Sequence, residues 1–292
     1  MDQAQQLRNI IKAQQTRPVS RVIAVTGGKG GVGKSNTAIN LAIQLQRMGQ
    51  RVIILDADLG MANIEVMFAA IPHYTLYDLL YKGMRMRDII TWGPEGIGFV
   101  SGGSGITGMS NLSREYLEYI IQNLAELDAM ADIIIIDTAA GIHDDVKEFL
   151  AASGEVLVVM TADPASITDS YSLLKALSLH SRFSTESTLV KVITNMVDSE
   201  EEGRVLFSKL NRVVQTYLKI PLEYLGSVPK DKELSDNVKQ QIPISIANPK
   251  AKSAQSYERI ANVLMNKEMN QKLKKRGMAA FFSHIVAGKK YQ

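Results

Sequence analysis

The stretch Gly28-Lys29-Gly30-Gly31-Val32-Gly33-Lys34-Ser35 decides the fold of this chain. It fits the pattern Gly-x-x-x-x-Gly-Lys-Ser, in which glycines let successive backbone amides curl around phosphate oxygens. An apolar run at 22–26 precedes the loop and a helical stretch at 36–48 follows it, which is the setting this motif requires. The sequence therefore predicts a phosphate site at the start of a helix, where Lys34 reaches the β- and γ-phosphates and Ser35 can bind Mg²⁺.

Apolar, β-rich runs recur on both sides of this loop and are separated by helical stretches. Near-continuous apolar strands are typical of a parallel sheet that helices cover on both faces. We therefore predict an α/β fold with three layers, the P-loop NTPase fold, with a mainly parallel sheet. The expected strands are 21–26, 52–56, 98–101, 133–137, 156–161, 190–195 and 224–228.

Composition fits one large globular domain with short extensions, because 46% of the 292 residues are hydrophobic and 22% are charged. No run approaches the ~20 apolar residues that span a bilayer, and the first residues lack the apolar core of a signal peptide. We therefore expect a cytoplasmic protein. The chain has no cysteine, which excludes disulfides, thiolate-bound zinc and cysteine-ligated iron–sulfur clusters.

Three aspartates follow predicted strands, at the strand ends where open sheets place their ligands. Asp56 and Asp58 are two residues apart, a spacing that puts both side chains on one side of an extended chain. Aspartates after strands are also common turn residues, so Asp56 could instead cap a turn. Asp137 ends the run Ile133–Ile136 and has the expected form of the Walker B carboxylate, which holds Mg²⁺ through water.

The loop has an additional lysine near its start, Lys29. With it, the string from Lys29 to Ser35 resembles the deviant Walker A motif of the MinD/ParA class of ATPases. The resemblance covers about residues 21–266. It implies hydrolysis of ATP to ADP with Mg²⁺, and a homodimer in the ATP state in which Lys29 crosses to the partner's nucleotide. A solvated loop lysine without this role is the alternative.

The same resemblance assigns roles to individual residues. It places Asp56 near Mg²⁺ and its waters, and it makes Asp58 the residue that orients or deprotonates the attacking water. Gly141 would sense the γ-phosphate through its amide, although Ala139 stands where the family usually has Pro or Gly. The expected catalytic residues are Lys29, Lys34 and Asp58, and the expected Mg²⁺ contacts are Ser35, Asp56 and Asp137. The expected nucleotide contacts are Gly28, Lys29, Gly30, Gly31, Val32, Gly33, Lys34, Ser35, Asn36, Gly141, Asn195 and Pro229.

Two of these nucleotide contacts concern the adenine base. Asn195 ends a predicted strand and resembles the asparagine that contacts adenine in the family, and Pro229 to Asp231 resembles the segment that closes around the base. An asparagine at a strand end is otherwise a turn former, and that alternative stays open.

The last 26 residues, 267–292, carry seven Lys or Arg and one Glu, a net charge of +6 against +3 for the whole chain. Met278, Phe281, Phe282 and Ile285 follow helical spacing, with Val286 beside them. An apolar face with basic flanks is typical of a helix that lies in a membrane interface. The alternative is a helix that packs onto its own domain, and the two states could alternate.

The N-terminal string Asp2-Gln3-Ala4-Gln5-Gln6-Leu7-Arg8 resembles the activating helix of the FlhG family, also called YlxH or FleN. In that family the helix stimulates FlhF, a GTPase of the signal-recognition-particle type, so Asp2, Gln3, Ala4, Leu7 and Arg8 would bind this partner. A capped helix without a partner is the alternative. The expected divisions are an activating helix and linker at 1–20, an ATPase domain at 21–266 and a membrane-targeting tail at 267–292.

These features together predict a slow ATPase switch, reversibly bound to the inner face of the cell membrane, that controls flagellar number and placement. Further flagellar basal-body components are possible partners. One alternative is a DNA-segregation ATPase whose basic tail contacts phosphates, although DNA binding has no need of Phe281 and Phe282. Another is a nucleotide-gated scaffold with negligible turnover, which the presence of Asp58 and Asp137 disfavours.

Overall fold

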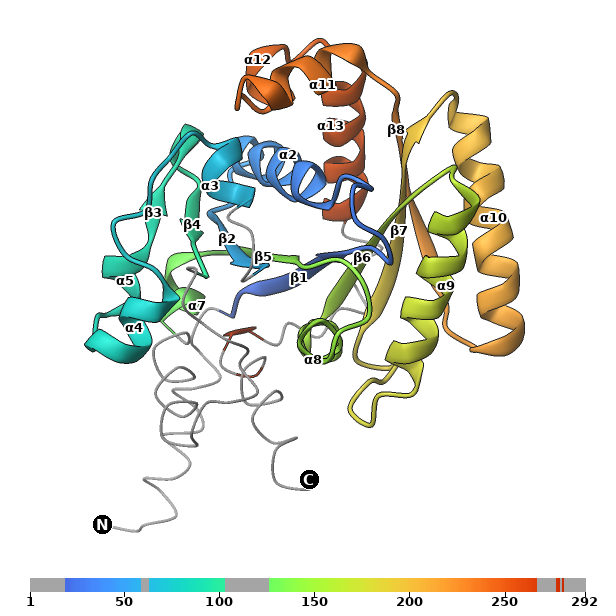
Figure 1. Ribbon diagram of the computed structural model, residues 1–292, viewed down its shortest axis with the longest axis horizontal. Coiled ribbons are helices and arrows are strands. Elements are labelled where there is room, and N and C mark those ends of the chain that lie inside the picture. The colour runs from blue at the N-terminus through green and yellow to red at the C-terminus, as the bar shows by residue number, and fades with distance from the viewer. Residues whose placement is uncertain (1–18, 59–62, 103–125, 267–276, 279, 281–292) are drawn as a thin grey trace.

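The computed structural model describes residues 19–58, 63–102, 126–266, 277, 278 and 280 (Figure 1). Within these residues an eight-stranded sheet runs in the order β3-β4-β2-β5-β1-β6-β7-β8. All neighbouring strands are parallel except β3 and β4. The strands are β1 (Arg21–Thr26), β2 (Val52–Ala57), β3 (Thr91–Trp92), β4 (Gly98–Val100), β5 (Ile133–Thr138), β6 (Glu155–Thr161), β7 (Leu189–Val197) and β8 (Leu222–Pro229).

The predicted α/β fold is confirmed, and all seven predicted strands are present. The strand that the sequence did not predict is β3, whose two residues are too few to show an alternating pattern. The middle of each central strand is mainly apolar because both faces of the sheet are covered: Ile23 and Val25 face one core cluster, while Val22 and Ala24 face the other.

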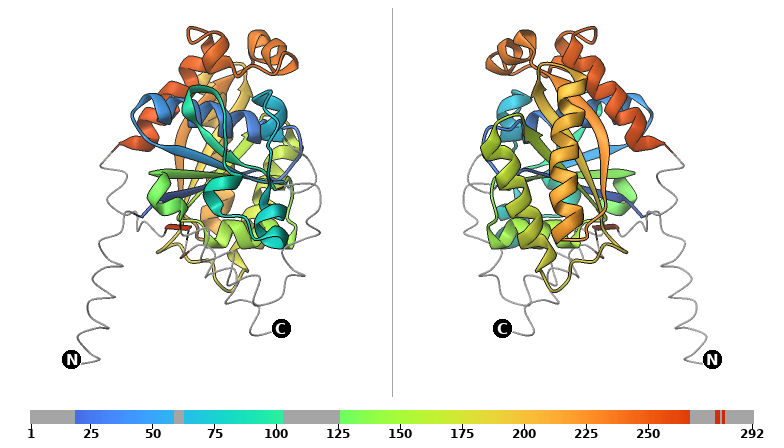
Figure 2. Two further views of the ribbon diagram at one scale, coloured as in Figure 1. Left: turned by 90° about the vertical axis from the view of Figure 1, so that its left-hand side faces the viewer. Right: turned by 90° about the vertical axis from the view of Figure 1, so that its right-hand side faces the viewer.

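Helices form the two outer layers (Figures 1 and 2). One layer holds α2 (Lys34–Arg47), α3 (Asn63–Met67), α11 (Lys232–Lys239), α12 (Ile244–Ala247) and α13 (Lys252–Met265). The other holds α4 (Leu76–Lys82), α5 (Met86–Ile89), α7 (Leu127–Met130), α8 (Asp144–Ala152), α9 (Pro164–Ser178) and α10 (Glu200–Tyr217). A single 3₁₀ turn, η1 (Pro94–Gly96), joins β3 to β4. A search of the described helices finds none with the length and apolar character needed to cross a membrane.

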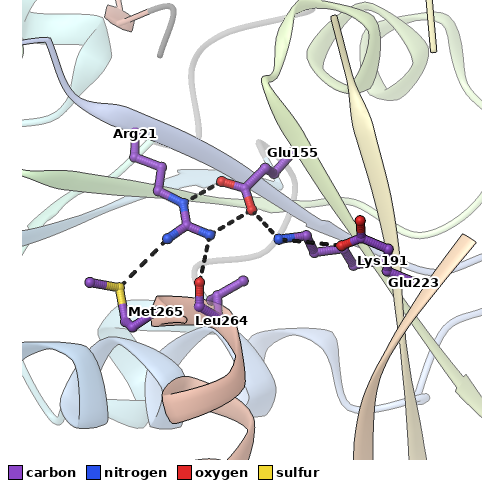
Figure 3. Close-up of polar contacts among 6 residues, drawn as sticks. All are labelled: Arg21, Glu155, Lys191, Glu223, Leu264 and Met265. Carbon is purple, nitrogen blue, oxygen red and sulfur yellow. Dashed lines mark hydrogen bonds and ion pairs between the residues drawn. The ribbon is translucent and has the colours of Figure 1, made fainter. Parts of the chain in front are cut away.

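A buried ionic network joins the amino ends of the central strands to the end of α13 (Figure 3). Glu155 accepts two hydrogen bonds from the guanidinium of Arg21 and one, at 2.8 Å, from Lys191 Nζ. Arg21 also donates to the Leu264 carbonyl at 3.0 Å. Burial alone would raise the pKa of the Glu155 carboxyl, but Arg21 and Lys191 outweigh it and hold that pKa below its usual value.

Candidate functional site

The phosphate loop connects the end of β1 to Lys34, the first residue of α2. Gly33 precedes the helix with φ 91° and ψ 29°, a left-handed conformation that favours glycine. Gly28 is required for a different reason: there is no space for a side chain, because a Cβ there would lie 2.3 Å from the backbone carbonyl carbon of Asp169 on α9. The glycines therefore serve both the curl of the loop and its close approach to a neighbouring helix.

Asp137, the penultimate residue of β5, lies beside the start of α2 and is fully buried. Neither of its carboxylate oxygens has a hydrogen-bond partner among the described residues. Burial raises its pKa to about 6, although the nearby Ser35 hydroxyl and the Lys34 ammonium favour the charged form. A buried carboxylate with two free oxygens beside a serine hydroxyl fits the ligand set of Mg²⁺ in phosphate-loop proteins.

Lys34, whose charge acts on this carboxylate, is itself buried, with 9% of its surface exposed. Burial lowers the pKa of its ammonium group, and the charges of Asp137 and Asp58 act in the opposite direction. The structure therefore brings Lys34, Asp58 and Asp137 together, as the sequence predicted.

Asp56 and Asp58 differ in environment although they are two residues apart. Asp56 lies beside Asp137 in the register of β2 and β5, and its oxygens accept from the N–H groups of Asp58 at 3.1 Å and Ile64 at 3.4 Å. Burial and the neighbouring Asp137 raise the pKa of Asp56 to about 8. Asp58 is half-buried and accepts from Asn63 Nδ2 at 3.3 Å, so the second carboxylate is the one accessible from solvent.

Lys29 forms an ion pair with Asp163 of the same chain, with Nζ 2.6 Å from Oδ2. Asp163 also caps α9 by accepting from the Ala165 N–H at 3.0 Å. Both charged side chains remain nearly half exposed. Asp163 was not predicted from the sequence. An aspartate followed by Pro164 just after a strand does, however, indicate the start of a helix at the edge of the sheet where ligands bind.

The segment after β5 contacts the base of the phosphate loop. Gly141 has φ 93°, and its N–H donates to the Gly27 carbonyl at 3.3 Å. Thr138 Oγ1 donates to the Val25 carbonyl at 3.0 Å. The Gly141 amide expected to sense the γ-phosphate thus lies at the loop, with Gly27 as its present acceptor. Ala139 is half-buried and packs against the core.

Asn195 has contacts other than the predicted one with adenine. Its side chain is 4% exposed, and Nδ2 donates to the Val32 carbonyl of the phosphate loop at 2.8 Å. Pro229 ends β8 and lines a pocket of about 190 Å³ between α10 and α13, together with Val197 and Ser199. Asn195 and Pro229 therefore lie on neighbouring strands, where the first contacts the phosphate loop and the second lines a pocket.

Met278 has the position expected if the tail helix packs onto its own domain, the alternative to a membrane interface. It is fully buried in the core, and its N–H donates to Asp128 Oδ1 at 2.8 Å. The membrane interpretation needs this side chain on the surface, whereas here it packs inside the protein. Other predicted residues lie outside the described part of the chain: Asp2, Gln3, Ala4, Leu7, Arg8, Phe281, Phe282, Ile285 and Val286.

Comparisons with known proteins agree with this geometry. Residues 23–244 match the CobQ/CobB/MinD/ParA nucleotide binding domain family. The chain is 40% identical over 241 residues to the antiactivator FleN of Pseudomonas aeruginosa, covering 82% of this chain and 85% of FleN. It is 32% identical over 295 residues to the flagellum site-determining protein YlxH of Helicobacter pylori, covering 98% of each.

A solved structure supports the fold independently. The septum site-determining protein MinD from Pyrococcus horikoshii OT3, complexed with Mg-ADP, superposes with a TM-score of 0.65 at 22% identity, covering 87% of this chain and 99% of that one. The phosphate loop, the two buried carboxylates and the extent of these matches lead to one conclusion. The chain belongs to the CobQ/CobB/MinD/ParA family of nucleotide-binding domains, and within it to the FleN/YlxH group of P-loop ATPases.

Proposed function

We propose that this chain is an ATP-driven switch that regulates flagellar number and placement. The observation that carries the proposal is the gathering of Lys34, Asp58 and Asp137 beside the phosphate loop, in a chain 40% identical to an antiactivator named FleN. The second relative is named a flagellum site-determining protein and matches over nearly the whole chain, which supports the same biological role.

In the proposed reaction, Lys34 binds the β- and γ-phosphates, and the amides of the loop hold their oxygens. Ser35 and Asp137 would hold Mg²⁺, which neutralises charge that develops on the phosphoryl oxygens. Asp58, the more accessible carboxylate, follows β2 and orients the attacking water, while Asp56 stays buried beside Asp137. The protein thus positions the phosphates and the attacking water and supplies positive charge beside the phosphoryl oxygens.

We further propose that ATP closes a homodimer. Lys29 would leave Asp163 and contact the partner's nucleotide, which is possible at low cost because water screens an exposed ion pair. The state of the dimer would then control the two terminal segments. The C-terminal segment would associate peripherally with anionic membrane, and the N-terminal segment would stimulate FlhF.

Phosphate release from Mg-ATP tests the enzymatic part. We expect Asp58→Ala to lower the rate by about 100-fold or more, because a positioned acid–base group contributes at least that much. The matched control is Asp236→Ala, which removes an exposed acid of α11 paired with Lys239. Equal release from wild type and Asp58→Ala would refute the assigned role of Asp58.

Deletion of residues 1–18, which leaves the buried Ser20 in place, tests the regulatory part. We expect the shortened chain to release phosphate at the normal rate and to lose its stimulation of the FlhF GTPase. If the shortened chain still stimulated the FlhF GTPase fully, the role proposed for the N-terminal segment would be wrong. The ATPase assignment would not be affected.

A further inference from the structure

Asn195 links the end of β7 to the phosphate loop. Its Nδ2 donates to the Val32 carbonyl, which is 163 residues away in sequence, and its Oδ1 accepts from the Met196 N–H at 2.9 Å. Both ends of the amide are therefore engaged within the protein, and the side chain is almost fully buried. A turn former would make only the second of these contacts.

Two local features show that the loop and Asn195 fit each other closely. A Cβ on Gly33 would lie 2.3 Å from Asn195 Nδ2, so the loop has no space for a side chain at that position. Met196 adopts φ 54°, an uncommon left-handed conformation for a residue other than glycine. The Oδ1 contact with the Met196 N–H holds that turn and so fixes where Nδ2 points.

The consequence for the loop follows from the geometry of the peptide unit. A trans peptide is planar, so the carbonyl of Val32 and the N–H of Gly33 point in opposite directions. When Asn195 holds the Val32 oxygen toward β7, the Gly33 N–H must point away from β7. If the peptide turned over, it would present a carbonyl oxygen instead of a donor to the phosphates.

We propose that Asn195 is a positioning residue of the phosphate loop: its Nδ2 group holds the Val32–Gly33 peptide so that the Gly33 N–H is presented to the polyphosphate of the nucleotide. The inference rests on the proposed function, because it requires that the loop binds phosphate. It assigns to Asn195 a role that does not depend on the base.

Binding of inorganic tripolyphosphate, which has no base, separates this role from adenine recognition. The full chain is titrated with tripolyphosphate, Mg-ATP and Mg-GTP as wild type, Asn195→Ala and Asn195→Asp. The Asp variant keeps the shape and the acceptor of Asn195 but loses the Nδ2 donor. We expect all three ligands to bind about three- to tenfold more weakly in both variants, with an unchanged ATP-to-GTP ratio, as the loss of one hydrogen bond predicts.

Met196→Asp is the matched control for the charge that Asn195→Asp introduces. It adds a carboxylate at the next position, on an exposed side chain, and leaves Asn195 in place. We expect it to weaken tripolyphosphate binding less than Asn195→Asp does. An equal loss in the control, together with full binding by Asn195→Ala, would overturn the inference.

Lys34→Ala distinguishes failure of the inference from failure of the proposed function. In one outcome, Lys34→Ala no longer binds tripolyphosphate, while both Asn195 variants bind it normally and lose only the preference for ATP over GTP. Asn195 then recognises the base, and the inference is wrong. If Lys34→Ala binds tripolyphosphate as tightly as wild type, the loop is not the phosphate site and the proposed function itself fails.

Discussion

At the phosphate site, contacts between individual side chains determine which groups are available to a nucleotide. Lys29 is paired with Asp163 in the same chain, and the pair is nearly half exposed to solvent. The Asp163 carboxylate raises the pKa of the Lys29 ammonium through a hydrogen bond and its charge. Lys29 is therefore cationic and occupied, and any contact with a partner's nucleotide has to compete with Asp163.

Asp163→Asn should remove that competition while keeping the cap of α9, because asparagine is as good a capping residue as aspartate. We expect turnover at limiting protein concentration to rise by no more than about fivefold, since an exposed ion pair is weak in water. Steady-state phosphate release measures this effect. Asp144→Asn, which loses an exposed pair with Lys147 on α8, is the control. Unchanged or slower turnover in Asp163→Asn would show that the pair does not restrain Lys29.

The sequence predicts candidate site residues but not their environments. Asp56, Asp58 and Asp137 follow apolar strands, and that pattern is visible without a structure. The pKa of Asp56 depends on burial and on Asp137, which lies beside it only because β2 and β5 are neighbours in the sheet. The contact of Asn195 with Val32 likewise depends on β7 lying two strands from β1.

Secondary-structure elements are tied together at the amino edge by the network of Arg21, Glu155 and Lys191. Each residue lies on a different strand, and the carbonyl of Leu264 brings in the end of α13. Apolar runs predicted the strands well, but charged residues at or near strand starts carry no signal for their pairing. That pairing is set by strand order and register.

Glu155→Gln should destabilise the protein because it leaves the positive charges of Arg21 and Lys191 buried without their carboxylate. We expect a loss of about 3–5 kcal/mol in the free energy of unfolding at pH 7, the usual cost of removing one partner of a buried pair. Chemical denaturation measures it. Glu223→Gln is the control, since Glu223 is one-third exposed and 3.8 Å from Lys191, and it should cost less than about 1 kcal/mol.

The Glu155 pair also fixes the direction of a pH dependence. The pKa of Glu155 is lower in the folded protein than its ordinary value, so its stabilising contribution is present above that ordinary pKa and is lost as pH falls through the folded pKa. The difference in unfolding free energy between wild type and Glu155→Gln should therefore shrink as pH falls below about 4.5, near the ordinary pKa of glutamate. A difference that grows toward acid pH would contradict this assignment.

At the scale of the whole molecule, segments near the two ends of the chain meet at one carboxylate. Asp128 Oδ1 accepts from the N–H of Ser20 at 3.3 Å and from the N–H of Met278 at 2.8 Å. Gly277 also donates to the Ser20 carbonyl at 3.3 Å. The buried Met278 side chain adds an apolar contact, so residues 277 and 278 are docked against the domain.

A chain without cysteine allows the docked state to be measured directly. Met278→Cys should react slowly with a thiol-alkylating reagent in ADP, because the side chain is buried, and faster with a non-hydrolysable ATP analogue and anionic liposomes. Ala280→Cys is exposed and should react quickly in every state. If the alkylation rate of Met278→Cys were the same with either nucleotide and with or without liposomes, release of the segment around residue 278 would be excluded as part of the switch.

The central claim is that this chain is an ATPase whose activity depends on closing a dimer through Lys29. Phosphate release per chain, measured from Mg-ATP across a range of protein concentrations, tests it most directly. We predict that the rate per chain of wild type rises with protein concentration until it saturates, and that Lys29→Ala still binds ATP but stays at a low, concentration-independent rate. A rate per chain that is constant with concentration and unaffected by Lys29→Ala would contradict the account.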